Sequence, residues 1–158
     1  MPGQTEYVID ASALIDLWRP KNYSRKVFPS LWRNFEELVA SGRLTSVREA
    51  RRELTRGASD KLADWVKRHS ALFTDPGEEE VNLAVRITAR FHGLVDPNKE
   101  EGQADPFLIA KAKLADSTVV TNEGKGGPSK PKIPFVCGEL KVRCLDLVGM
   151  FEDLGWIF

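Results

Sequence analysis

Two carboxylates stand where an α/β chain would place reactive groups. Asp10 directly follows the apolar run 7–9, and Glu123 lies two residues beyond the β-branched run 119–121. In parallel α/β sheets, ligands gather in the crevice beyond the carboxyl ends of the strands. We therefore expect both side chains at the same edge of a sheet.

Further acids lie on stretches with helical patterns. Asp105 precedes Pro106, and an N-cap acid followed by proline at the first helical position predicts a helix start. Glu49 and Glu53 are one helical turn apart in a charged run. Each acid also has an ordinary explanation, namely capping for Asp105 and simple solvent exposure for the two glutamates. On these residues alone, the choice between Glu49 and Glu53 stays open.

Acids brought together in this way would form a cation site. Like charges held close raise one another's pKa, so a carboxylate cluster persists as anions only where hard cations neutralise it. Ligand sets made only of oxygen select Mg²⁺ or Mn²⁺ over zinc. The pattern therefore predicts a magnesium or manganese centre.

Other chemistries have weaker support. His69 and His92 occupy helical patterns with no serine or cysteine placed as a nucleophile. The segment 124–128 contains glycines and a lysine but lacks the spacing of a phosphate-binding loop. The turn after Asp10 has no second acid two residues on, which disfavours an aspartyl-phosphate mechanism. The four tryptophans are predicted to be core residues rather than base-stacking platforms.

The elements that must position these acids alternate between strand and helix. Apolar and β-branched runs predict strands over 6–9, 43–46, 117–121 and 142–145. Helical periodicity and caps predict helices over 12–18, from Ser30 to a stop at Gly42, over 48–56, from a cap at Asp60, over 78–92, from Asp105 to Leu114, from Pro134 and over 147–154. Such alternation predicts an α/β fold, a three-layer α/β/α sandwich with a parallel sheet of four or five strands.

Length and composition place the chain in a broad class. Its 158 residues fit one domain spanning 1–158, and its formal charge is zero. Lys and Arg nevertheless outnumber acids in 1–56 and in 124–143, so these segments could line a groove for phosphates. Cys137 and Cys144 suggest neither a zinc cluster nor a disulfide framework. With no apparent signal peptide or membrane span, we expect a soluble cytoplasmic protein.

Four short motifs, in order along nearly the whole chain, resemble those of the PIN-domain nucleases. Among these, the chain is most similar to VapC-like ribonuclease toxins and related prokaryotic PIN proteins. Residues 7–12 resemble the first motif, 104–110 the third and 119–123 the fourth, where many members have aspartate in place of Glu123. Residues 46–54 resemble the second motif, and this resemblance selects Glu53 over Glu49.

The resemblance implies a PIN-like fold and metal-dependent hydrolysis of RNA phosphodiester bonds. Asp10 and Asp105 would hold Mg²⁺ or Mn²⁺, Glu53 and Glu123 would complete the site directly or through water, and Ser12 and Thr121 would support it. Candidates for holding the RNA backbone are Arg48, Arg51, Arg52, Lys111, Lys125 and Lys132.

The resemblance also implies a biological setting, the toxin of a toxin-antitoxin pair, with a homodimer and a small antitoxin protein. Two other functions stay open. One is a catalytically silent PIN module that binds RNA or protein, and the other is a phosphatase or phospho-acceptor domain.

Overall fold

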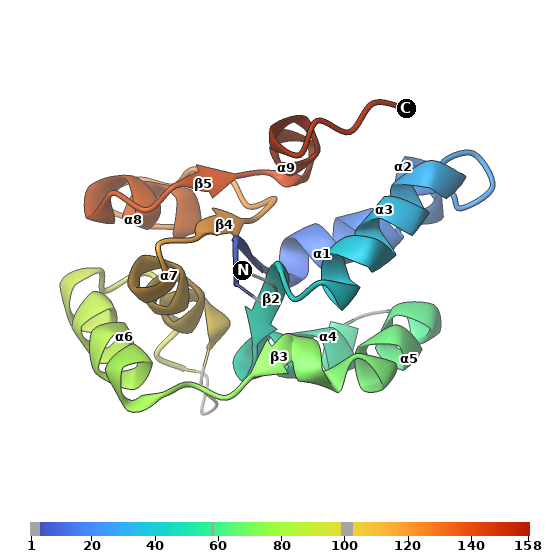
Figure 1. The fold of residues 1–158 in the computed structure, drawn as a ribbon. Helices are drawn as coiled ribbons and strands as arrows, with labels where there is room; N and C mark the ends of the chain where they lie inside the picture. Colours follow the sequence, from blue (N-terminus) through green and yellow to red (C-terminus); the bar gives the residue numbers. More distant parts are fainter. Residues whose placement is uncertain (1–3, 58, 99–102) are drawn as a thin grey trace.

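A parallel sheet forms the centre of the fold (Figure 1). The computed structural model describes residues 4–57, 59–98 and 103–158. Its five strands run in the order β3-β2-β1-β4-β5, and every neighbouring pair is parallel. Their bounds are β1 Tyr7–Ile9, β2 Leu44–Val47, β3 Phe73–Thr74, β4 Thr118–Val120 and β5 Cys144–Leu145.

Helices cover both faces of the sheet. In Figure 1, α6, α7 and α8 lie on one side of it, and α1, α2 and α3 lie on the other. The helices are α1 Ala11–Trp18, α2 Pro20–Tyr23, α3 Pro29–Ala40, α4 Arg48–Gly57, α5 Asp60–Arg68, α6 Glu78–Arg90, α7 Ala104–Ala115, α8 Ile133–Leu140 and α9 Leu147–Asp153, with the 3-10 turn η1 Ser70–Leu72. This arrangement confirms the predicted three-layer α/β/α sandwich. In the described part of the chain, no helix has both the length and the apolar character needed to cross a membrane.

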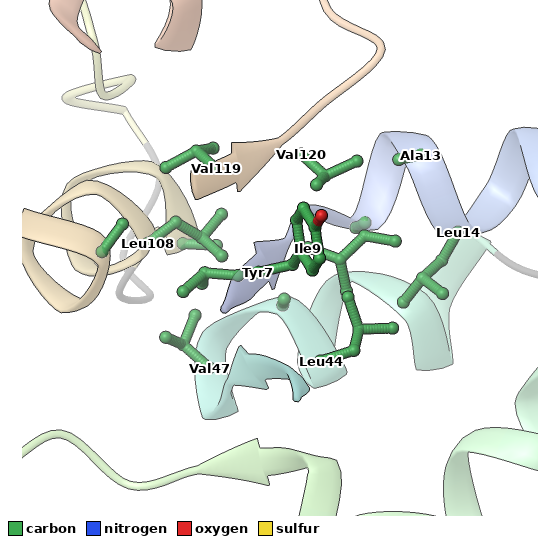
Figure 2. Close-up of a cluster of buried hydrophobic side chains, with 14 of the residues drawn as sticks. Tyr7, Ile9, Ala13, Leu14, Leu44, Val47, Leu108, Val119 and Val120 are labelled. Carbon is green, nitrogen blue, oxygen red and sulfur yellow. The ribbon is translucent and has the colours of Figure 1, made fainter. Parts of the chain in front are cut away.

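The central strand is apolar because both of its faces are covered. Successive side chains of a strand point to opposite faces, so a strand with helices on either side buries every residue. Figure 2 shows the resulting cluster, with Leu108 of α7 and Leu14 of α1 approaching β1 from opposite sides. Both leucines, like Val8 and Ile9, are fully buried. This core holds the carboxyl end of β1 in a fixed place.

Three predicted helix caps are wrong. The helix expected to have Ser30 as its cap begins at Pro29, with Phe28 as the N-cap residue. The helix expected to start with Asp105 as its cap begins at Ala104, with Gln103 as the N-cap residue. Asp105 therefore lies in the first turn of α7, where the helix dipole favours an acid. In α5, the N-cap is Ser59, whose hydroxyl accepts from the amide of Leu62, and Asp60 is the first helical residue.

Three short elements, β3, α2 and η1, were not predicted. Strand β3 has two residues, which is too short to show an alternating pattern. It pairs with β2, with Ser46 opposite Phe73 and Val47 opposite Thr74. The single turn α2 begins at Pro20, two residues after the end of the predicted helix over 12–18.

Candidate functional site

Asp10 and Glu123 follow adjacent strands at one edge of the sheet. Strands β1 and β4 pair in parallel with Ile9 opposite Val120, and the amide of Asp10 extends this pairing by donating to the Val120 carbonyl at 2.8 Å. Both carboxylates therefore lie beyond the carboxyl ends of their strands, as the strand assignments predicted.

Three hydrogen bonds fix the buried Asp10 carboxylate. Its Oδ1 accepts from the amide of Ala11 at 2.8 Å, which makes Asp10 the N-cap of α1. Its Oδ2 accepts from Ser12 Oγ and from Thr121 Oγ1, each at 2.8 Å. The side chain is 2% exposed. Burial raises the pKa of Asp10, and the hydrogen bonds from Ser12, Thr121 and Ala11 oppose that rise.

Glu123 is coupled to Asp10 both electrostatically and through Thr121. Burial raises the pKa of Glu123, and the negative charge of Asp10 raises it further. The amide of Ile133 donates to Glu123 Oε2 at 3.4 Å and, with the charge of Lys132, works in the opposite direction. The Thr121 hydroxyl accepts from the amide of Glu123 at 3.2 Å. The same hydroxyl therefore contacts both the Asp10 carboxylate and the backbone of Glu123.

Asp16 and Asn122 belong to the same hydrogen-bond network but were not predicted. The Asn122 side chain donates from Nδ2 to Asp16 Oδ2 at 2.8 Å and accepts at Oδ1 from the amide of Leu147. Its backbone amide donates to Ser12 Oγ. Asp16 could have been found from sequence, because it lies one helical turn after Ser12 and so on the same face of α1.

The acids of α4 differ sharply in burial. Glu53, selected by the resemblance, is exposed, whereas Glu49 is 2% exposed. Glu49 Oε1 accepts from Arg48 at 3.1 Å, and Glu49 Oε2 is buried without a hydrogen-bond partner in the described part of the protein. Because Glu49 lies two residues beyond the end of β2, which neighbours β1, it is a second candidate for the α4 acid of the site.

The four predicted acids do not form a ready-made metal cage. Asp105 is half-buried in the first turn of α7, a helix that packs against β1, β2 and β4. Among the described residues, no group of three or more His, Cys, Asp or Glu side chains could hold a metal ion. The structure thus brings Asp10 and Glu123 together and does not gather Glu53 and Asp105 with them.

One predicted backbone-binding residue is wrong. Lys111 is buried and donates to the hydroxyl of Thr74, and burial lowers its pKa. Lys111 is therefore not accessible to an RNA strand bound at the protein surface. The other predicted cations are exposed, namely Arg48, Arg51, Arg52, Lys125 and Lys132.

A family match covers nearly all of the chain. Residues 7–158 match the family described as Domain of unknown function (DUF4411). The chain belongs to the DUF4411 family. No curated protein sequence matches this DUF4411 protein.

Two solved structures show what the DUF4411 fold is similar to. FitAB bound to the IR36 DNA fragment has a TM-score of 0.54 and 16% identity, with 89% of this chain and 94% of that chain covered. FitAcB from Neisseria gonorrhoeae has a TM-score of 0.50 and 17% identity, with 88% and 96% covered. Together with the parallel five-stranded sheet, this likeness shows a PIN-like fold.

The Asp10 and Glu123 pair of this DUF4411 protein fits a divalent cation. Asp10 is buried, Glu123 is half-buried, and the two carboxylates repel each other, which is the condition that a bound cation relieves. Mg²⁺ commonly binds through only one or two protein carboxylates together with substrate phosphates. Asp10 Oδ1 accepts one hydrogen bond and keeps a lone pair for such an ion. A larger acid cluster is not required for this kind of site.

Proposed function

We propose that this DUF4411 protein is a Mg²⁺- or Mn²⁺-dependent endoribonuclease whose site is built on Asp10 and Glu123. The observation that supports the proposal most strongly is the electrostatic coupling of two desolvated carboxylates at the carboxyl edge of β1 and β4. Such an edge is where ligands bind in parallel α/β sheets. The PIN-like fold and the four motifs agree with the same chemistry.

The bound ion would polarise a phosphoryl oxygen and make water a stronger acid at neutral pH. Asp10, fixed by hydrogen bonds from Ser12, Thr121 and Ala11, would hold it without reorganising. Glu123, with its raised pKa, is suited to accept the proton of the attacking water. The water oxygen bonds to phosphorus, the bond to the 3′-oxygen breaks, and the products are a 5′-phosphate and a 3′-hydroxyl.

Two more acids complete the proposed site. Asp105 is the second principal ligand by its motif, and it is half-buried in the first turn of α7, which packs against β1 and β4. The α4 acid is Glu53 by its motif or Glu49 by its burial. These assignments rest on the sequence motifs and on the position of each helix.

The proposed setting is a toxin-antitoxin pair in the cytoplasm. In this setting the protein is a homodimeric toxin, RNA is the substrate, and a small antitoxin protein covers the acidic edge. The support is the resemblance to VapC-like toxins together with the PIN-like fold. A silent PIN module that binds RNA or protein is the second candidate, favoured by the lack of a three-residue metal cluster in the described residues.

An RNA cleavage assay separates these two functions. Purified protein is incubated with mixed structured and single-stranded RNAs, with and without Mg²⁺ or Mn²⁺. The Asp10→Asn variant and the matched variant Glu79→Gln, which changes an exposed acid of α6, are tested beside it. We expect metal-dependent cleavage that is lost only in Asp10→Asn. Intact RNA under every condition would favour the silent module.

A further inference from the structure

A cavity lies at the opposite end of α1 from Asp10. It has a volume of about 860 Å³ and is bounded by the end of α1, by α2, by the segment joining α2 to α3, by α3 and by α5. That volume is within the range typical of small-molecule sites. Asp10 caps the first turn of α1, and Trp18, its last residue, lines the cavity. The eight residues of α1 separate the two by about 12 Å at ~1.5 Å per residue.

Three indole rings line this cavity. The Trp18 ring centroid lies 4.7 Å from that of Trp32 in an edge-on arrangement and 4.8 Å from that of Trp65. The indole nitrogens are already engaged, since Trp32 Nε1 donates to the Tyr23 carbonyl at 2.9 Å and Trp65 Nε1 donates to Glu36 Oε1 at 3.1 Å. Trp32 and Trp65 are only 5% and 2% exposed, so the ring surface that a ligand could contact is that of the half-buried Trp18.

A planar cation covers the Trp32 ring. The Arg25 guanidinium carbon lies 3.8 Å from the Trp32 ring centroid and 5.6 Å from that of Trp18. Arg25 itself is exposed. A guanidinium that rests with one face on an indole presents its other face to solvent, and nucleobases stack on such planes as they do on aromatic rings.

The rim of the cavity is positively charged. Arg25, Lys26, Lys61 and Arg68 line it, against the acids Glu36 and Asp64. Glu36 accepts a hydrogen bond from Trp65 at Oε1, and its Oε2 lies 3.8 Å from His69 Nε2. None of the four cations is paired with an acid elsewhere in the described residues. The rim therefore has unpaired positive charge for phosphate groups.

The geometry points to a nucleotide-binding subsite in this cavity, where one unpaired base of a single-stranded RNA stacks on Arg25 beside Trp18 while Lys61 and Arg68 contact its phosphates. This inference deepens the proposed ribonuclease function, since it takes RNA as the substrate. At the ~3.4 Å rise of a stacked strand, the 12 Å along α1 corresponds to about four nucleotides. The cavity would hold the strand at a fixed distance from the carboxylates that act on it.

A binding experiment without cleavage tests this subsite. A short fluorescein-labelled single-stranded RNA is titrated with the full chain in EDTA, and its anisotropy is compared with that of an abasic strand of equal length and of an RNA duplex. The three ligands share phosphates, but only the single strand offers free bases. We expect the single strand to bind about tenfold more tightly than the abasic strand, because stacking of one base contributes on that scale.

Two pairs of variants show whether the preference for the single strand over the abasic strand depends on the cavity. Arg25→Ala and Trp18→Leu should remove it, whereas the matched changes Arg86→Ala on α6 and Trp156→Leu near the C-terminus should retain it. Thermal melting by circular dichroism shows whether each variant is folded. If Trp18→Leu is not folded, the test rests on Arg25→Ala, because Arg25 is exposed. Equal binding of abasic and normal strands, or a preference that survives in folded Arg25→Ala, would overturn the subsite.

The outcome is independent of catalysis. Base-selective binding through Arg25 without cleavage in Mg²⁺ or Mn²⁺ would retain the subsite and reject the nuclease. Cleavage without base-selective binding would retain the nuclease and reject the subsite. If every variant bound the single-stranded RNA as tightly as the wild type does, the cavity would not be an RNA site, and the inference would be contradicted.

Discussion

The hydroxyl of Thr121 donates to Asp10 Oδ2 at 2.8 Å, joining residues 111 positions apart in sequence. The same oxygen accepts from the amide of Glu123 at 3.2 Å. One side chain at the end of β4 thus fixes the acid of β1 and the backbone of the next acid. The candidate site is a property of the strand pairing and not of any single loop.

Removing this hydroxyl should damage both stability and activity. Thr121→Val leaves the buried Asp10 with one hydrogen bond fewer, at a cost of about 1–3 kcal/mol in the free energy of unfolding. RNA cleavage should fall because Asp10 and Glu123 lose their common partner. Urea denaturation and the cleavage assay measure the two effects. Thr121→Ser, which keeps the hydroxyl, is the control, and an equal loss in both variants would argue against this role.

Asp10→Asn should abolish cleavage without destabilising the protein in the absence of metal. The pKa of Asp10 is raised in the folded state, so its ionisation weakens folding as the pH rises through that pKa, and a neutral side chain avoids this loss. Asparagine keeps one oxygen to accept from the amide of Ala11, and the hydroxyls of Ser12 and Thr121 can turn to accept from its Nδ2. At neutral pH the variant should therefore unfold at a temperature equal to or above that of the wild type. Differential scanning calorimetry in EDTA makes the comparison, and a markedly lower midpoint would contradict the burial argument.

The α4 acid can be assigned by a pair of variants. Because Glu49 is buried beyond the end of β2 and Glu53 is exposed, Glu49→Gln should reduce the cleavage rate more than Glu53→Gln. A loss of tenfold or more corresponds to about 1.4 kcal/mol of transition-state stabilisation. Single-turnover kinetics at saturating metal would show it. The reverse order would support the assignment made from the motif.

Acid should weaken the attachment of α9 to the sheet. Arg143 donates two hydrogen bonds to Asp153, at 2.7 and 3.0 Å, and with the Tyr7 hydroxyl it lowers the pKa of Asp153 to about 2. A lowered pKa gives stability that is present above the unfolded value near 3.8 and is lost as the pH falls through about 2.

The Asp153→Asn variant tests this pH dependence. Since the pair is largely exposed, we expect it to lose no more than about 1 kcal/mol at neutral pH and to show a flatter decline between pH 4 and 2. Urea midpoints measured across that range would show the difference. Glu152→Gln, on the same helix, should behave as the wild type. Parallel declines in the wild type and Asp153→Asn would refute the linkage.

Sequence patterns predicted most of the sheet because the runs of apolar and β-branched residues that form its strands are local features of the sequence. Strands β1 and β4 are apolar on both faces, so their ends, and with them Asp10 and Glu123, could be placed from sequence. Strand β3 could not be predicted, because two residues are too few to show an alternating pattern and the strand exists only through its pairing with β2. Lys111 resembled a surface cation because its burial against Thr74 is set by tertiary packing.

In the candidate site and the cavity, too, the sequence predicted individual residues but not the contacts that depend on tertiary packing. Ser12 and Thr121 were identified by motif, but the contact of Asn122 with Asp16 depends on how α1 meets the end of β4. Burial alone distinguishes Glu49 from Glu53, and burial requires the packed helix. The tryptophans were predicted to be core residues, and they pack against the core as expected. The convergence of Trp18, Trp32 and Trp65 on one cavity depends on the packing of α1, α3 and α5.

Direct titration with Mn²⁺ tests the central claim most directly, because it requires neither substrate nor turnover. Mn²⁺ binding is followed by electron paramagnetic resonance with the wild type, Asp10→Asn, Glu123→Gln and the control Glu79→Gln. We predict one saturable site in the wild type and in the control, weakened binding in Glu123→Gln and none in Asp10→Asn. Identical binding in all four proteins, or no binding in the wild type, would contradict a metal centre built on Asp10 and Glu123.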